Sequence, residues 1–252
     1  MASEDSESES RARTAAQFAT THWSVVLAAG QHDSAQGSAA LEQLCATYWY
    51  PLYAYVRRRG YNPDDAQDLT QGFFACLLRR NPFPHLRSAG AKFRSFLLTA
   101  LNHYLISEWH KDHARKRGGD CVRVPLDSTE SETRYALEVG ETLTPDAAYE
   151  RRWAEAVLAQ ALNRLREEQI AQGNRDLFEA LAPCLTGAED ALPYAELAAR
   201  LDRTAGAIRS AAHRLRRRYG ELLRLEVAHT VASPAEVDEE LRHLLSVLSG
   251  GP

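Results

Sequence analysis

Arginines concentrate near the C-terminal end of the chain, and their chemistry is that of polyanion binding. Eight of them fall between Arg200 and Arg224, a stretch with only two acidic residues, Asp202 and Glu221. A guanidinium can bind a phosphate or the edge of a guanine through two parallel hydrogen bonds. A second basic cluster, near the end of the first half, consists of Lys111, Arg115, Lys116 and Arg117. Two separate clusters predict contact with a polyanion at two places.

The segment between the two clusters is acidic. Residues 126–150 carry seven acidic side chains against the single Arg134. The net charge of −4 therefore conceals two basic modules joined by an acidic segment. We expect residues 119–146 to form a solvated, flexible linker.

The sequence lacks the common motifs of bond chemistry. It contains no GxxxxGK[ST] phosphate loop, no GxSxG elbow and no HExxH pair. His110 and His113 could join His103 or Cys121 at a metal ion, but these residues lack the compact pairing of structural zinc sites. The four cysteines include no CxxC pair, which gives no disulfide or zinc framework. We expect no catalysis, no metal, no cofactor and no small-molecule substrate.

The N-terminus and the hydropathy pattern bear on the compartment. The chain opens with MASEDSESES, which is acidic where a signal peptide would be basic. No apolar run approaches the ~20 residues that span a bilayer. With 44% hydrophobic and 25% charged residues, the composition is that of a globular protein. We expect a cytoplasmic protein without membrane contact, with residues 1–17 as a disordered tail.

Apolar residues recur at three- and four-residue spacing almost throughout, which predicts an all-α fold without strands. Proline, glycine and capping residues divide the chain into helices. The expected helices cover about residues 21–27, 38–58, 64–80, 92–117, 147–171, 175–185, 194–201 and 205–225.

The last two of these helices are predicted to form a helix-turn-helix across Asp202-Arg203-Thr204. The polar face of the second helix suits the major groove, where arginine binds guanine and serine binds base edges or phosphate. A solvated basic helix in an unrelated bundle is the alternative. The candidate DNA contacts on this face are Arg209, Ser210, His213, Arg214, Arg217 and Arg218.

Three runs of sequence resemble parts of one known family. The run DDAQDLTQGFFACLL (64–78) is similar to a polymerase-docking helix, and FRSFLLTALNHYLISEWHKDHARKR (93–117) resembles a helix that melts and reads the minus-ten promoter element. The run YAELAARLDRTAGAIRSAAHRLRRRY (194–219) resembles a helix-turn-helix that reads the minus-thirty-five element. The chain is identified as a member of the bacterial RNA polymerase sigma factors of the extracytoplasmic-function (ECF) type. The resemblance covers most of residues 20–225.

The resemblance implies a function in transcription initiation. A factor of this kind binds RNA polymerase core, recognises both elements of promoter DNA and promotes DNA melting. The residues expected to contact the polymerase are Asp65, Asp68 and Gln71, which share one face of the docking helix. A favourable interaction with the helix dipole would also explain Asp64 and Asp65. Gly72 stands where the family usually has an acidic residue, which removes one expected contact.

The resemblance also implies contacts to the minus-ten element. Many family members have asparagine where His103 stands, so the base preference is expected to differ; a plain surface histidine is the alternative. Tyr104 and Trp109 could stack on bases, but their helical spacing favours core packing. The expected minus-ten contacts are Asn102, His103, Lys111, Arg115, Lys116 and Arg117.

The expected domain plan has two helical modules, with residues 18–118 like sigma region 2 and residues 147–226 like sigma region 4. Their linker either threads a basic channel of the polymerase, as in the family, or is merely soluble. Residues 227–252 form an amphipathic extension that begins with the capping box Ser233-Pro234-Ala235-Glu236 and carries Val237, Leu241, Leu244, Leu245 and Leu248 on one face. A helix this short must dock. It either tunes the DNA-binding surfaces or, more simply, stabilises the second module.

Two other classes of protein stay open at this point. The chain could be a helix-turn-helix regulator that binds DNA without polymerase, or a scaffold that binds protein partners. A plain regulator has no use for Asp65, Asp68 and Gln71 beside a separate strand-capturing module. An anti-sigma or other regulatory protein could be a further partner.

Overall fold

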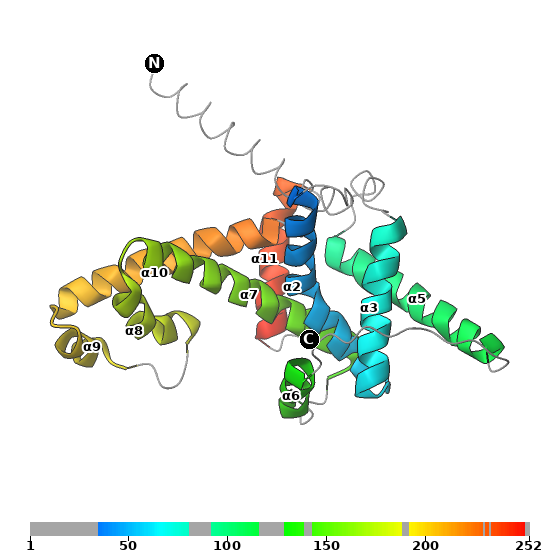
Figure 1. Ribbon diagram of the computed structural model, residues 1–252. Coiled ribbons are helices and arrows are strands. Elements are labelled where there is room, and N and C mark those ends of the chain that lie inside the picture. The colour runs from blue at the N-terminus through cyan, green and yellow to red at the C-terminus, as the bar shows by residue number, and fades with distance from the viewer. Residues whose placement is uncertain are drawn as a thin grey trace, which may run out of the picture. The chain divides into compact units, whose positions relative to one another are not determined.

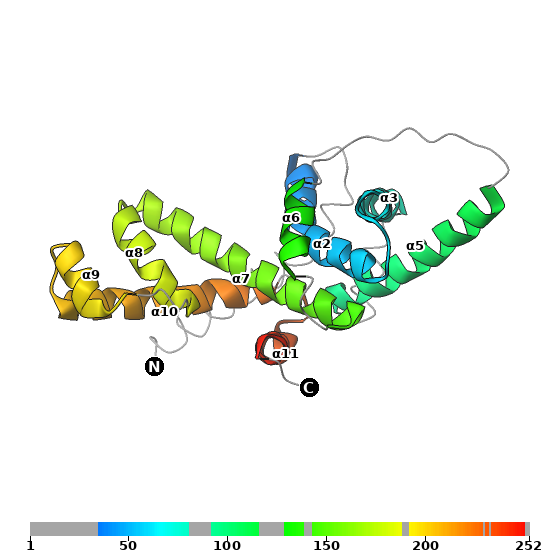
Figure 2. The same ribbon diagram turned by 90° about the horizontal axis from the view of Figure 1, so that it is seen from below.

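The computed structural model describes residues 35–80, 92–115, 129–138, 143–187, 192–228, 230–231 and 233–249. Every regular element among them is a helix (Figures 1 and 2), so the all-α prediction is confirmed. The chain divides into two compact units, with residues 1–156 and 227–252 in unit 1 and residues 157–226 in unit 2. The expected acidic tail and the helix expected near residues 21–27 lie outside the described residues.

Unit 1 has a core rich in aromatic side chains. Its helices are α2 (Ala35–Arg58), α3 (Pro63–Arg80), α5 (Phe93–Arg115), α6 (Thr129–Glu138), the first turns of α7 (Pro145–Ala171), the short 3₁₀ helix η2 (Pro234–Glu236) and α11 (Val237–Leu248). Burying aromatic rings removes a large apolar area from water, and this stabilises the unit. The largest fully buried side chains here are Tyr48, Leu52, Tyr53, Tyr55, Leu97, Leu101, Tyr149 and Trp153.

A tight turn sets α3 against α2. Gly60 takes a positive φ of 92°, which glycine adopts without strain, and α3 then begins with Pro63 at its first position. The Asn62 side chain accepts a hydrogen bond from the backbone N–H of Asp65 and donates one to the Asp65 carboxylate, both at 2.8 Å. This reciprocal cap satisfies N-terminal donors of the helix and fixes where α3 starts.

Helix α6 lies within the segment for which the sequence predicts a flexible linker. Figure 2 shows it beside α2, where Arg57 donates to both carboxylate oxygens of Glu132 at 2.8 and 3.0 Å. The hydroxyl of Tyr53 also donates to Glu132, and Arg57 stacks over the Tyr135 ring at 4.6 Å. Arg57 lowers the pKa of Glu132 through these hydrogen bonds. Residues 129–138 are therefore a helix docked on α2 and not a flexible connector.

Unit 2 packs four helices around one aliphatic core. It contains the rest of α7, then α8 (Arg175–Thr186), α9 (Tyr194–Arg200) and α10 (Ala205–Ala228), up to Glu226. The unit starts at residue 157, ten residues after the expected module boundary, because the first turns of α7 belong to unit 1. Its core residues are Ala161, Leu165, Phe178, Leu181, Leu197, Ala198, Ile208, Ala211, Ala212, Leu215 and Leu222.

The C-terminal extension folds into unit 1. Ser233 caps its start by accepting a hydrogen bond from the N–H of Ala235 at 3.3 Å, and Val237 and Leu244 are buried. The simpler alternative, an extension that stabilises the helix-turn-helix module, is wrong, because residues 227–252 cluster with unit 1. Leu245, expected on the packed face, is 59% exposed. Among the described helices, none is long and apolar enough to cross a membrane.

Candidate nucleic-acid interface

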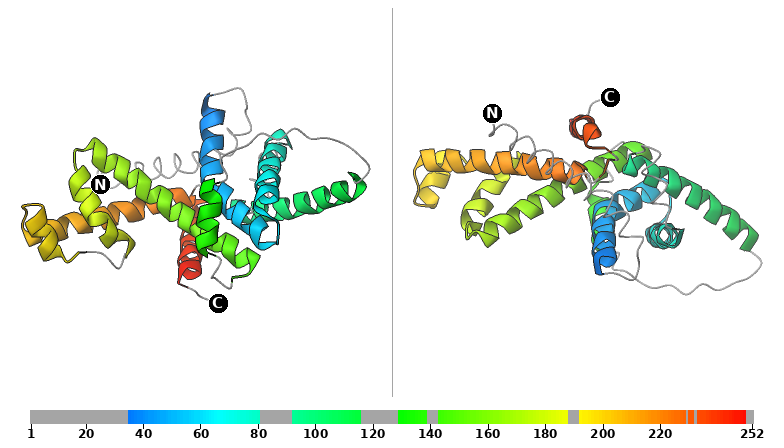
Figure 3. Two further views of the ribbon diagram at one scale, coloured as in Figure 1. Left: turned by 60° about the horizontal axis from the view of Figure 1, so that its bottom comes forward. Right: turned by 90° about the horizontal axis from the view of Figure 1, so that it is seen from above.

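The turn between α9 and α10 positions the candidate recognition helix. Asp202 adopts a left-handed φ of 49°, and Arg203 returns a backbone hydrogen bond to Ala198 at 2.9 Å. Thr204 then caps α10, since its hydroxyl accepts from the N–H of Ala207 at 3.2 Å. Figure 3 shows α9 and the start of α10 in yellow, meeting at this turn.

Helix α10 buries one face and exposes the other, as its sequence predicts. Ile208, Ala211, Ala212 and Leu215 belong to the core of unit 2. On the opposite side, five of the six predicted DNA contacts are exposed to solvent. Of the described residues, none forms an ion pair or hydrogen bond with the side chains of Arg209 or Arg214. The five exposed residues are Arg209, Ser210, His213, Arg214 and Arg217.

Arg218, the sixth predicted contact, is engaged inside unit 2. Its guanidinium donates to both carboxylate oxygens of Glu168 on α7, at 2.7 and 2.8 Å, and to Glu221 at 2.9 Å. These hydrogen bonds raise the pKa of Arg218 and lower the pKa of Glu168. Arg218 therefore joins α10 to α7, whereas its neighbours on the helix face solvent.

A hollow of about 320 Å³ opens beside the exposed arginines. Arg203, Arg214 and Arg217 line it together with Gln172 and Asn174 from the turn after α7. Arg218 and its partner Glu168 also line the hollow, so it has four arginines against one carboxylate, a balance that favours an anion such as a phosphate. Arg203 is not among the contacts predicted from the sequence, although its place in the turn before α10 is a usable signal.

The candidate minus-ten residues on α5 have different environments. Asn102 is half-buried, and its side-chain oxygen accepts from the hydroxyl of Tyr55 at 2.8 Å and from Arg59 at 3.0 Å. His103 is exposed and lines a surface pocket with Ile106, Ser107, His110 and Lys111. Lys111 forms a surface ion pair with Glu108 at 2.6 Å. Of the remaining predicted contacts, the Arg115 side chain and all of Lys116 and Arg117 lie outside the described residues.

The two residues of α5 considered for base stacking, Tyr104 and Trp109, have different environments. Tyr104 packs edge-on against Phe73 of α3, with ring centroids 5.9 Å apart, in line with core packing. Trp109 is 52% exposed, so the prediction that it packs in the core is wrong. Among the side chains of α5 that the structure describes, Leu105 is the last buried one, and Ile106 and Trp109 beyond it are exposed.

The predicted polymerase contacts lie on α3. Asp65 and Asp68 are exposed, and Asp65 also takes part in the cap with Asn62. Gln71 is half-buried, with its amide nitrogen enclosed. Gly72 faces α5 so closely that a Cβ there would lie 2.3 Å from the Tyr104 hydroxyl oxygen. A larger side chain at position 72 would therefore require the Tyr104 side chain to shift.

The histidines of α5 were the candidates for a metal site. Within the described part of the chain, no group of three histidine, cysteine or acidic residues could hold a metal ion. His103 and His110 line the same surface pocket, whereas the His113 side chain and Cys121 lie outside the described residues.

The described part of the chain is all-helical, and its helices α9 and α10 form a helix-turn-helix with an exposed basic face on α10. The family model described as ECF sigma factor matches residues 33–202, more than half of the chain. The protein belongs to the ECF sigma factor family, and its role is that of a sigma factor in transcription initiation. The match ends at Asp202, so α10 and the C-terminal extension lie beyond it. No curated protein and no solved structure matches the chain.

Proposed function

We propose that this sigma factor binds RNA polymerase core, recognises the minus-thirty-five and minus-ten elements of a promoter and promotes DNA melting for transcription initiation. The observation that supports this proposal most directly is the exposed face of α10. Arg209 and Arg214 lie in solvent there, on a helix whose start is fixed by the turn at Asp202. A helix held in this way can enter the major groove and present guanidinium groups to base edges.

The minus-thirty-five contacts divide into two kinds. Arg209, Ser210 and His213 belong to the first half of α10, which is the part of a recognition helix that meets base edges. Arg214 and Arg217 line the hollow with Arg203, and there they suit phosphates of the DNA backbone. Arg218 takes no part in DNA binding on this proposal, because Glu168 and Glu221 hold its guanidinium.

The second half of α5 supports capture of the minus-ten element. His103, His110 and Lys111 surround an apolar surface at Ile106, and the exposed Trp109 follows on the same helix. Unpaired bases stack on aromatic rings, and a lysine can bind the phosphates that connect them. Asn102 contributes by fixing Tyr55 and Arg59 rather than by a free amide oxygen.

The exposed acidic residues of α3 support docking on polymerase. Asp65 and Asp68 present carboxylates that can pair with a basic surface of the core enzyme. The proposal assigns the chain to the cytoplasm, where core enzyme and promoter DNA are found, and gives it no bond chemistry, cofactor or small-molecule substrate. An anti-sigma or other regulatory protein is a further proposed partner.

Co-purification with RNA polymerase core tests the proposal. Asp68→Arg reverses an exposed charge on α3, whereas Glu167→Arg makes the same charge change on the exposed surface of α7 in unit 2. We expect saturable binding of the wild type and of Glu167→Arg, and loss of binding in Asp68→Arg with its helical circular dichroism unchanged. Transcription from a promoter library should then yield initiation at a shared two-element motif.

Two outcomes would contradict the proposal. A folded wild-type chain that binds no core would leave a helix-turn-helix regulator as the better description, provided that it still binds duplex DNA. Equal core binding by wild type and Asp68→Arg would show that α3 is not the docking helix.

A further inference from the structure

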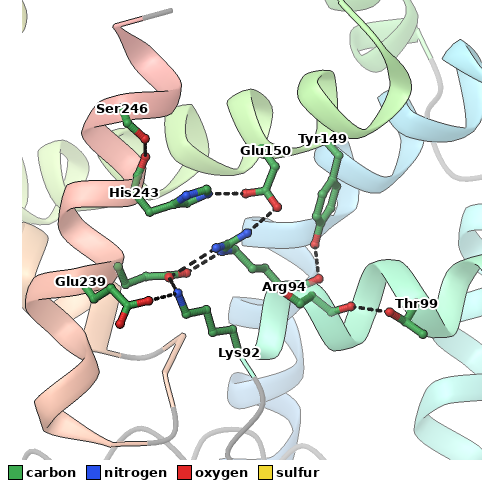
Figure 4. A network of polar contacts seen from close by, with 10 residues as sticks. Lys92, Arg94, Thr99, Tyr149, Glu150, Glu239, His243 and Ser246 are labelled. Carbon is green, nitrogen blue, oxygen red and sulfur yellow. Dashed lines mark hydrogen bonds and ion pairs between the residues drawn. The ribbon is translucent and has the colours of Figure 1, made fainter. Parts of the chain in front are cut away.

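The first turn of α5 lies against the C-terminal extension. Arg94 in that turn is only 5% exposed, and its Nε donates to the fully buried carboxylate of Glu240 on α11 at 2.5 Å. Lys92, directly before the helix, pairs with Glu239 at 2.8 Å and with Glu240 at 3.1 Å. Figure 4 shows Lys92 and Arg94 pointing toward α11, whose first turn is acidic.

The extension also satisfies the backbone at the start of α5. The N–H of Phe93 donates to the carbonyl oxygen of Thr230 at 3.1 Å. The first N–H groups of a helix have no partner within the helix, and negative charge is favourable near them. The first turn of α5 contains no acidic residue. Glu239 and Glu240 of α11 supply the carboxylates, and Thr230 supplies an acceptor, from a segment more than 130 residues further along the chain.

A third element completes the network. Glu150 at the start of α7 contacts Arg94 with one oxygen and His243 of α11 with the other, the latter at 2.9 Å. The Tyr149 hydroxyl donates to the backbone carbonyl of Arg94 at 2.9 Å, as Figure 4 shows. The Arg94 guanidinium also lies over the buried Trp153 ring, 5.0 Å from its centroid. Side chains from α7 and α11 thus fix the start of α5.

We propose that Glu240 is a positioning residue for α5, and that the C-terminal extension caps this helix and holds it in the orientation needed for minus-ten DNA. Helix α5 is continuous from Phe93 to Arg115, so the fixing of its first turn sets the direction of its distal half. That half carries His103 and Lys111. The inference rests on the proposed function of α5, and it concerns a segment outside the region that matches the family.

Amide hydrogen exchange in the full chain tests the cap directly. Glu240→Gln keeps the shape of the side chain but removes the charge that faces Arg94. Glu239→Gln removes only the more exposed partner of Lys92, and Leu245→Gln changes a solvent-exposed position of the same helix. We expect exchange at residues 93–96 to be about tenfold faster or more in Glu240→Gln, less so in Glu239→Gln, and unchanged in Leu245→Gln.

Binding to single-stranded DNA gives a second readout. The probe is a pool of random oligonucleotides of about 12 nucleotides, compared with duplex DNA of mixed sequence, both measured by fluorescence anisotropy. We expect Glu240→Gln to lose severalfold affinity for the single strands and none for the duplex, which unit 2 binds. General destabilisation of unit 1 would lower the same affinity, so the exchange pattern at residues 93–96 separates positioning by Glu240 from a merely stabilising role.

Two results of the exchange experiment would contradict the proposal that the extension caps α5. Unchanged exchange at residues 93–96 in Glu240→Gln would overturn it, and so would an equal increase across all of unit 1, because that marks general destabilisation. If the wild type binds no single-stranded DNA, the assignment of α5 to the minus-ten element fails. The exchange pattern then still shows whether the extension positions the helix.

Discussion

Replacement of Arg218 by glutamine should destabilise unit 2 and leave DNA binding almost intact. The guanidinium makes two parallel bonds to Glu168, at 2.7 and 2.8 Å, with side chains that are 42% and 28% exposed. Exposed ion pairs contribute about 0.2–1 kcal/mol, and the bidentate geometry places this pair at the upper end. A loss of about 1 kcal/mol lowers the Tm of a domain of this size by about 4–8 °C.

Arg214→Gln is the matched comparison, because it removes the same charge from an exposed position of the same helix. We expect no change in Tm for this variant. Its affinity for duplex DNA should fall, and the slope of log K against log salt should decrease by about 1, since one phosphate contact is lost. Differential scanning calorimetry and anisotropy titrations at several salt concentrations measure the two effects.

The reverse pattern would refute this reasoning. If Arg218→Gln reduced the salt slope as much as Arg214→Gln and left the Tm unchanged, Arg218 would be a DNA contact.

The pH dependence of the Tm tests whether Glu168 is the partner of Arg218. Hydrogen bonds from Arg218 lower the pKa of Glu168 in the folded state, so the pair stabilises above about pH 4.3, the unfolded value. The Tm difference between wild type and Arg218→Gln should therefore shrink as the pH falls below about 4.

Three further substitutions test local features. Gly72→Ala should shift the Tm more favourably in a Tyr104→Phe background than in the wild type, because its Cβ would lie 2.3 Å from the Tyr104 hydroxyl oxygen; equal shifts in the two backgrounds in thermal melts would show that this contact costs nothing. Asp202→Gly should stabilise unit 2 by about 0.5–1 kcal/mol in urea unfolding, since φ is 49° there; destabilisation would show that the Asp202 side chain is needed. Glu132→Gln should increase amide exchange in residues 132–136 by weakening the contact to Arg57, and unchanged exchange would show that α6 docks without this pair.

The sequence predicts features that depend on neighbouring residues. The helices expected within the described residues, the start of α3 after Asn62 and the exposed face of α10 all follow from spacing within a few positions, and each is present. Trp109 shows the limit of this reasoning. Its spacing matches that of the buried residues of α5, but burial ends at Leu105, and periodicity does not reveal how far a neighbouring helix extends.

Features that depend on distant partners could not be predicted. Arg218 has the pattern of a DNA contact until Glu168, fifty positions earlier, is brought beside it by the packing of α7 on α10. The docking of α6 depends in the same way on Arg57, which is 75 positions from Glu132. A single sequence contains no signal for such pairs, because many acidic residues could serve each arginine equally well.

These distant pairs also explain how a chain with a net charge of −4 can present a basic surface to DNA. Glu240 and Glu150 face Arg94, and Glu132 faces Arg57, so these carboxylates are neutralised within unit 1. The electrostatic potential at a binding surface depends mainly on the charges close to it, because salt at 0.1 M screens the effect of charges more than about 10 Å away. Arg209 and Arg214 have no acidic partner among the described residues, and they dominate the potential along the exposed face of α10.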